Sequence, residues 1–135
     1  MSELVIFDSS VIIDDLRNAV HRKRIQAVVG IVRNSSVVLA ELWRGASKPS
    51  EWAFLRAMGK NHPILTPTES MWIESGQILA RIGGQGGFTP GKLRELHFDL
   101  LIALTARSHG ARVITANRGD FQLIQQYRQF KLEVW

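Results

Sequence analysis

The chain has 135 residues, a length typical of a single domain, and we expect residues 1–135 to form one unit around one core. It contains no cysteine, which excludes disulfides, thiolate–metal sites and cysteine catalysis. Its 17 lysines and arginines outnumber its 12 aspartates and glutamates, and the net charge of +5 favours polyanionic partners, above all nucleic acid.

The N-terminal segment predicts neither secretion nor a membrane anchor. "MSELVIFDSS" has an acid, no basic region and only a short apolar run, so it differs from a signal peptide. No apolar stretch approaches the roughly 18 residues needed to cross a bilayer. We therefore expect a cytoplasmic protein without membrane contact, in which the triplet Arg118-Gly119-Asp120 has no adhesive role.

Short apolar runs followed by helical periodicity recur along the chain. Asp8, Ser9 and Ser10 form a cluster of N-cap residues after the first run, and Thr68 is expected to cap a later helix. In chain order we expect a strand at 4–7, a helix at 11–16, an amphipathic segment at 25–32, a strand at 37–39, a helix opening at Glu41, a helix at 49–59, a strand within 62–70, a helix at 69–82, a flexible loop at 83–91, a helix at 91–110 that ends on Gly110, a strand within 111–117, a short helix within 119–127 and an edge strand at 130–134.

Strands that alternate with helices predict a parallel sheet covered on both faces. The expected fold class is α/β, a three-layer α/β/α sandwich with a central, mostly parallel sheet of four to five strands. The glycine-rich loop at 83–91 follows no strand and lacks the lysine of a phosphate-binding loop, so we expect it only to connect two helices.

Four acids are candidate functional residues in such a fold. Asp8, Glu41 and Asp120 each follow an expected strand, and ligands gather at the carboxyl ends of parallel strands. Asp99 lies in "LHFDLLIALTAR", a helix that is apolar almost all round and must be largely buried. A buried acid is costly unless something pairs with it, which makes Asp99 the most informative residue of the sequence.

Carboxylates brought together repel one another and raise one another's pKa values. A divalent cation reverses that repulsion, and hard oxygen ligands suit Mg²⁺ or Mn²⁺. We expect Asp8, Asp99 and Asp120 to bind the metal, with Glu41 completing the catalytic set, in a site able to activate water for phosphodiester cleavage. No pair of histidines has the spacing of a zinc site, and no histidine is assigned a catalytic role.

Each acid also has an ordinary structural explanation. Asp8 and Asp120 have the positions of helix N-caps, and Glu41 has that of a first-turn acid favoured by the helix dipole. Asp99 has Arg94 and Arg107 as possible partners on its own helix, although neither shares its face well. The joint occurrence of all four acids favours the catalytic interpretation.

The stretches "VIFDSSVIIDDLR", "VVLAELWRG" and "LHFDLLIALTARSHGARVITANRGDF" together resemble the PIN-domain family, and most closely its VapC-type ribonuclease toxins. The resemblance covers nearly the whole chain. It implies a Mg²⁺-dependent endoribonuclease, usually a homodimer, that a small antitoxin holds inactive by inserting into the active-site groove. The acidic quartet that it implies is Asp8, Glu41, Asp99 and Asp120.

The resemblance also implies a lining for the pocket. Thr115 and Asn117 match polar residues that line it in relatives, and Ser9 lies beside the first acid. Two positions depart from the family pattern. Many relatives have Asn where this chain has Ser10, and some carry a fifth acid where this chain has Asn117, so a second metal is expected to bind weakly or only with substrate.

Basic residues close to these motifs are candidates for holding an RNA backbone, with solvated surface charge as the alternative for each; they are Arg44, Lys92, Arg94 and Arg118. Trp43, Trp52 and Trp72 are expected in the core or at a dimer interface rather than as base-stacking platforms. The sequence thus favours a metal-dependent endoribonuclease. A DNA or structure-specific nuclease on the same fold and a non-catalytic RNA-binding or scaffold protein stay open as alternatives.

Overall fold

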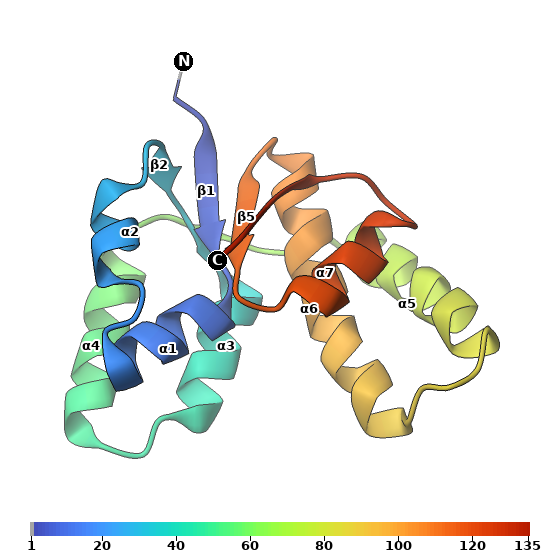
Figure 1. Cartoon of the computed structure of the whole chain (residues 1–135), viewed down its shortest axis with the longest axis horizontal. Helices are drawn as coiled ribbons and strands as arrows, with labels where there is room; N and C mark the ends of the chain where they lie inside the picture. Colours follow the sequence, from blue (N-terminus) through green and yellow to red (C-terminus); the bar gives the residue numbers. More distant parts are fainter. Residues whose placement is uncertain (1) are drawn as a thin grey trace.

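The chain folds into three layers, a parallel sheet between two layers of helices, as Figure 1 shows for the computed structural model, which describes residues 2–135. The elements are β1 (Leu4–Phe7), α1 (Ser9–Asn18), α2 (Arg22–Ala27), β2 (Ile31–Val32), β3 (Asn34–Ser35), α3 (Ser36–Gly45), α4 (Pro49–Asn61), β4 (Ile64–Leu65), α5 (Glu69–Gly84), α6 (Pro90–Ser108), β5 (Arg112–Thr115), α7 (Arg118–Gln125) and β6 (Lys131–Val134). The expected α/β/α fold class is confirmed.

The main sheet has four parallel strands in the order β2-β1-β5-β6. All residues of its two central strands, β1 and β5, are buried except Leu4 and Arg112, as expected of strands covered on both faces. Phe7 pairs with Ile114 at their carboxyl ends. Because both strands run the same way, the residues that follow them emerge at one edge of the sheet. β6 forms the outer edge, as the sequence predicted.

The chain changes its pairing partner at Arg33. Up to Val32 it pairs with β1, and the backbone N–H of Arg33 still donates to Val5 O at 2.9 Å. From Asn34 onward it pairs with β4 as a separate two-stranded parallel sheet. The buried Asn34 side chain reinforces this short ladder, because its Nδ2 donates to Met58 O at 2.8 Å and to His62 O at 3.3 Å.

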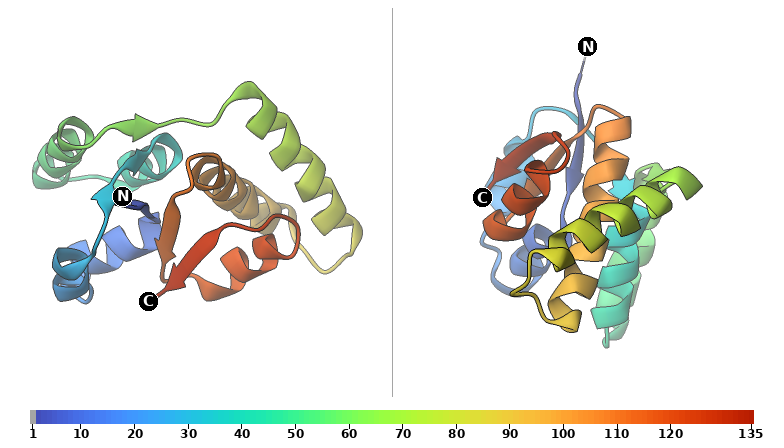
Figure 2. Two further views of the ribbon diagram at one scale, coloured as in Figure 1. Left: turned by 90° about the horizontal axis from the view of Figure 1, so that it is seen from above. Right: turned by 90° about the vertical axis from the view of Figure 1, so that its right-hand side faces the viewer.

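Helices cover both faces of the main sheet. Seen from above in Figure 2, α1, α2 and α7 lie on one side, and α3 and α6 lie on the other, with α5 packed against α6. α6 is the central helix of the core, since every residue from Asp99 to Ala106 along it is buried. None of the helices within residues 2–135 is long and apolar enough to span a membrane.

The segment 36–45 is a helix, so the strand expected at 37–39 and the helix start expected at Glu41 were wrong. Ser35 caps this helix, because its Oγ accepts hydrogen bonds from the backbone N–H groups of Val37 and Val38. Both valines are buried on the core-facing side of α3, and that burial overrides their preference for strands.

The segment 25–32 also differs from the single amphipathic stretch that we expected. It contains the end of α2, a turn and β2. Gly30 is responsible for the turn, since its φ of +146° is a backbone conformation that side-chain-bearing residues rarely adopt.

The expected helix ends were more accurate. Thr68 caps α5, with its Oγ1 accepting from Met71 N at 3.3 Å. Gly110 follows α6 with a φ of +64°, the conformation in which glycine commonly ends a helix. The loop between α5 and α6 falls within the glycine-rich stretch 83–91.

Gly30→Ala should destabilise the protein by about 1–3 kcal/mol, because a Cβ there meets Val5 Cγ2 at 2.7 Å and Glu3 O at 2.8 Å in a strained backbone conformation. Gly45→Ala is the matched control. It adds the same methyl group at the end of α3, where nothing lies within 4 Å, and should be neutral or stabilising by up to ~1 kcal/mol. Urea unfolding of the three proteins measures both effects, and equal stability of the two variants would contradict this account of the turn.

Candidate active site

The candidate site lies at the carboxyl ends of β1 and β5. Asp8 follows β1 directly, and its backbone N–H donates to Ile114 O at 2.9 Å. Thr115 ends β5 and is fully buried. The parallel pairing of the two strands therefore brings together residues more than a hundred positions apart in the chain.

The Asp8 carboxylate is held firmly by one of its two oxygens. Oδ2 accepts hydrogen bonds from Ser10 Oγ and Thr115 Oγ1, both at 2.8 Å, whereas the buried Oδ1 has no hydrogen-bond partner within residues 2–135. Burial raises the pKa of Asp8, and the two hydroxyl hydrogen bonds oppose that rise. Asp8 occupies the N-cap position of α1, but its side chain makes no cap hydrogen bond, so helix capping does not explain this carboxylate.

Ser10 is a site residue whose role the sequence did not reveal. Its Oγ donates to Asp8 Oδ2 and accepts from Ala116 N at 3.0 Å, which ties the start of α1 to the residue after β5. The sequence signal that could have identified this role is the departure of Ser10 from the family pattern, a small hydroxyl residue where many relatives have Asn. The Ser10 hydroxyl supports the acid by hydrogen bonding.

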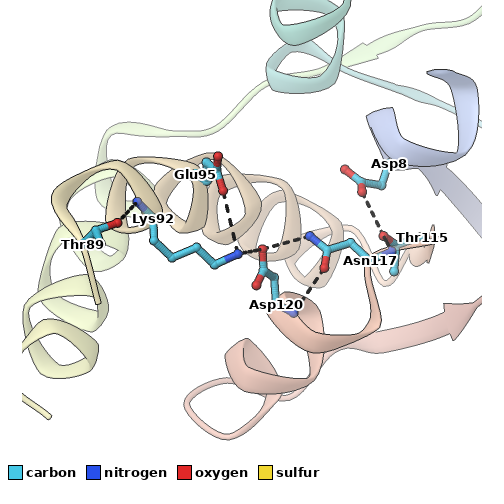
Figure 3. Close-up of polar contacts among 7 residues, drawn as sticks. All are labelled: Asp8, Thr89, Lys92, Glu95, Thr115, Asn117 and Asp120. Carbon is cyan, nitrogen blue, oxygen red and sulfur yellow. Dashed lines mark hydrogen bonds and ion pairs between the residues drawn. The ribbon is translucent and has the colours of Figure 1, made fainter. Parts of the chain in front are cut away.

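Asp120 lies in the first turn of α7, and its neighbour Asn117 is the N-cap of that helix. Asn117 Oδ1 accepts from Asp120 N at 3.4 Å, while Asn117 Nδ2 donates to Asp120 Oδ2 at 2.9 Å. The same Oδ2 accepts from Lys92 Nζ at 2.7 Å (Figure 3). The alternative that Asp120 is a simple N-cap was therefore wrong.

Asp99 is buried in the middle of α6, with 7% of its surface exposed. Neither Arg94 nor Arg107 forms an ion pair with it in the described part of the chain, 2–135, so that alternative was wrong. The pKa of Asp99 is raised to about 9, and burial is the largest cause. The negative charges of Asp8, Asp120 and Glu41 contribute next to this rise, in that order, and Lys92 opposes them. All four acids therefore share one electrostatic environment.

Glu41 reaches this environment from the body of α3 and not from a strand end, which corrects the reason for which we selected it. Its Oε1 accepts from Ser9 Oγ at 3.4 Å. The pKa of Glu41 is raised to about 7, chiefly by burial and then by the charge of Asp8, while Arg44 opposes the rise. The Arg44 guanidinium also lies 5.5 Å from the centre of the Phe98 ring, so it packs against α6 as well.

The remaining residues singled out from the sequence lie on the surface. Arg94 and Arg118 are exposed and form no ion pair with an acid within residues 2–135. Trp43, Trp52 and Trp72 are each between one third and one half exposed, so none is a core residue. The expected placement of these tryptophans in the core is wrong, and a dimer interface remains a prediction for them.

The donor set suits a hard cation, although no metal ligand set is preformed. Within residues 2–135, no three acidic or histidine side chains converge closely enough to hold one ion together. The charges of Asp8, Asp120 and Glu41 nonetheless raise the pKa of Asp99, and the buried Asp8 Oδ1 has no hydrogen-bond partner within residues 2–135. Carboxylate oxygens are the ligands that Mg²⁺ and Mn²⁺ prefer, so Asp8, Asp99 and Asp120 fit such an ion in chemistry.

Comparison with protein families agrees with this arrangement. The profile of the PIN domain family matches residues 5–125. The chain belongs to the PIN domain family. Membership of this family implies a nuclease, that is, a hydrolase of phosphodiester bonds. Comparison with curated protein sequences gives no match.

Solved structures share the PIN fold at low sequence identity. VapBC-1 from nontypeable Haemophilus influenzae is 24% identical, with a TM-score of 0.72 and 98% of each chain covered. VapBC2 from Rickettsia felis, solved with a DNA fragment from the promoter, is 19% identical, with a TM-score of 0.69 and 98% of each chain covered. VapBC-5 from Mycobacterium tuberculosis is 23% identical, with a TM-score of 0.60, and covers 97% of this chain and 96% of its own.

Asp99→Asn should remove a pH-dependent loss of stability from this PIN domain in chelator. The pKa of the Asp99 carboxyl is about 9 in the folded protein and close to the ordinary value of ~4 in the unfolded chain. As pH rises between these values, the unfolded chain releases its proton first, so the wild type loses stability. At pH 8 the variant should be more stable than the wild type by on the order of 1–3 kcal/mol, and the two should converge toward pH 4–5.

Urea unfolding at pH 5, 7 and 8.5 measures this difference. Glu69→Gln, an amide substitution of an exposed acid in the first turn of α5, is the control and should keep the wild-type pH dependence. Parallel pH profiles of wild type and Asp99→Asn would show that Asp99 is not protonated in the folded protein.

Proposed function

We propose that the chain is a Mg²⁺- or Mn²⁺-dependent endoribonuclease and the toxin of a toxin–antitoxin module. The observation that carries the proposal is Asp99, a carboxyl group buried in the central helix, without a basic ion-pair partner in the described residues, among three further acids. An RNA-binding or scaffold protein has no use for such a costly group, whereas a metal-dependent nuclease requires it.

Asp8, Asp99 and Asp120 would hold the metal in this proposal. A bound Mg²⁺ or Mn²⁺ supplies a water of lowered pKa and neutralises charge on the scissile phosphate. Ser10 and Thr115 keep Asp8 in place through its Oδ2, which leaves Oδ1 for the ion.

Glu41 is suited to proton transfer in the proposed reaction. Its pKa of about 7 lies close to neutral pH, and a general base is most effective when its pKa is near the operating pH. Ser9 donates to its Oε1 and orients the carboxyl group, and Arg44 limits the rise of its pKa. Glu41 would accept a proton from the attacking water while the three aspartates hold the metal.

RNA is the proposed substrate because of the charge and the family. The net charge of +5 attracts a polyanion, and the exposed Arg94 and Arg118 are candidates to contact its phosphates, with Arg44 nearer the acids. Thr115 donates to Asp8 and Asn117 donates to Asp120, so both would line the proposed substrate site between these acids. DNA cleavage on the same fold is the alternative, and a direct comparison of the two substrates distinguishes them.

The proposed partner is a small antitoxin protein, since similar solved structures are VapBC toxin–antitoxin assemblies. An apolar cavity of about 260 Å³ between α1, α2, α3 and α4 offers room for an apolar segment of such a partner. A homodimer in the cytoplasm completes the proposal. Trp43 and Trp72, both partly exposed, together with the 58% exposed Ile73, supply apolar surface for the dimer contact.

The purified protein should cleave single-stranded RNA with Mg²⁺ or Mn²⁺ and should stop when chelator is added. Asp99→Asn should lower the rate by about 10²-fold or more. Ser10→Ala removes the hydroxyl that donates to Asp8 and accepts from Ala116 N, and it should lower the rate by about 10- to 100-fold. Ser50→Ala, a substitution of an exposed residue on α4, is the control and should leave the cleavage rate unchanged. Gel electrophoresis of a labelled RNA and of the matching DNA measures all of these rates, and undiminished cleavage in excess chelator would exclude the metal mechanism.

The proposed homodimer predicts a mass of about twice 15.2 kDa in sedimentation at micromolar concentration. Ile73→Glu should shift the equilibrium toward the monomer, because it places a charge on an exposed apolar part of α5. Glu69→Gln, on the first turn of the same helix, serves as the control. A wild type that sediments only at the monomer mass would contradict the dimer.

A further inference from the structure

Lys92 is the only lysine or arginine within residues 2–135 that forms an ion pair with one of the four site acids. It lies in the first turn of α6, where Thr89 caps the helix and its Oγ1 accepts from Lys92 N at 3.1 Å. From there the side chain extends to Asp120 Oδ2 at 2.7 Å, as Figure 3 shows. One elementary positive charge therefore lies on a carboxylate that the proposed function assigns to the metal.

The two partners of this ion pair differ in how firmly they are held. The Asp120 side chain is 12% exposed and is fixed by Asn117, which donates to the same Oδ2 at 2.9 Å. The Lys92 side chain is 38% exposed and ends a flexible stem of four methylene groups. Glu95, one turn along the helix and 3.8 Å from Lys92 Nζ, is a second acceptor whose side chain is 72% exposed. The lysine can therefore leave while the aspartate stays in place.

The ion pair also engages one of the carboxylates that would have to turn toward a metal ion. No three acidic or histidine side chains in the described chain, 2–135, meet at one point, and Figure 3 shows the Asp120 carboxylate directed at Lys92 while Asp8 lies beyond Asn117 and Thr115. A carboxylate oxygen that accepts from an ammonium at 2.7 Å is not free to bind a second cation at the same position.

We propose that Lys92 is the internal counter-cation of the site, which occupies Asp120 in the metal-free protein and is displaced from it when a divalent ion binds. This inference rests on the proposed metal-dependent function. In the metal-free protein, the ammonium group offsets part of the repulsion among the acids. When Mg²⁺ or Mn²⁺ enters, its two charges replace the single charge of Lys92 on Asp120, and the ammonium group moves toward Glu95 and solvent.

Lys92 is therefore a positioning residue with two states, one paired with Asp120 and one released from it. This refines its assignment as a phosphate contact. In the metal-free protein the ammonium is engaged by Asp120 and is not available to RNA. Only displacement leaves it free at the N-terminal end of α6, beside the same acids. The site then gains a cation for the RNA backbone at the step in which it gains its metal.

Lys92→Met tests the exchange, because it keeps the apolar stem and removes the charge. Calorimetric titration of the RNA-free protein with MnCl₂ should show about two- to fivefold tighter binding in the variant, the range expected when a partly exposed competing ion pair is removed. Thermal melts should show the opposite order without metal. In chelator the variant should melt below the wild type, because Asp120 has lost its counter-cation, and in millimolar Mn²⁺ its melting temperature should rise by more than that of the wild type.

Lys60→Met is the matched control, since Lys60 is exposed at the end of α4 and forms no ion pair in the described residues. It should bind Mn²⁺ as the wild type does. If Lys92→Met unfolds, Lys92→Gln keeps a polar end group and takes its place in both measurements.

Two outcomes overturn the inference, and they are distinguishable. In the first outcome, the wild type binds Mn²⁺ and the Lys92 variant binds it no more tightly. The variant also melts below the wild type by the same amount in chelator and in Mn²⁺. Lys92 would then only stabilise the fold through its ion pair with Asp120. That result leaves the proposed nuclease function intact. If neither protein binds Mn²⁺, the metal-dependent function falls and the exchange falls with it.

Discussion

The cost of holding four carboxyl groups in one poorly solvated environment is the constraint on which this site depends. Each acid meets that cost differently. Asp99 keeps its proton, Asp8 accepts two hydroxyl hydrogen bonds, Asp120 accepts from Lys92 and Asn117, and Glu41 titrates close to neutrality. Without a metal, protons and one lysine thus offset the negative charge of the four acids. In the function that we propose, a bound divalent ion and an RNA backbone would replace these protons and this lysine as partners of the acids.

The scaffold makes this concentration of charge tolerable by placing it at the end of a rigid apolar core. β1 and β5 are buried along their length, and their pairing fixes where Asp8 and Thr115 emerge. α6 is buried over the two turns that carry Asp99. Because these elements pack tightly against one another, the acids cannot move apart to relieve their repulsion. Hydrogen bonds and protonation within the site reduce the repulsion instead.

Much of this arrangement followed from the sequence, because the signals were strong and local. The apolar run at 4–7 and the β-branched run within 111–117 predicted the two central strands, and an acid in an apolar helix identified Asp99. The strand expected at 37–39 was wrong because Val37 and Val38 favour strands in isolation, whereas Ser35 and the core select a helix. The Lys92–Asp120 pair joins residues 28 positions apart on two helices. Rules of periodicity and capping concern neighbouring residues and cannot predict such a contact.

The change of strand partner at Arg33 has a consequence for how the molecule opens. β5 and β6 share a four-residue ladder, but β3 and β4 share only two residue pairs. Amide protection from solvent exchange is therefore expected to decrease from the centre of the main sheet toward β4, and the buried Asn34 side chain supplies what the short ladder lacks. The Asn34 carboxamide joins this ladder to the end of α4, which also packs against the core through the buried Leu55 and through Met58. Local opening is therefore expected to begin at β4 rather than at β1 or β5.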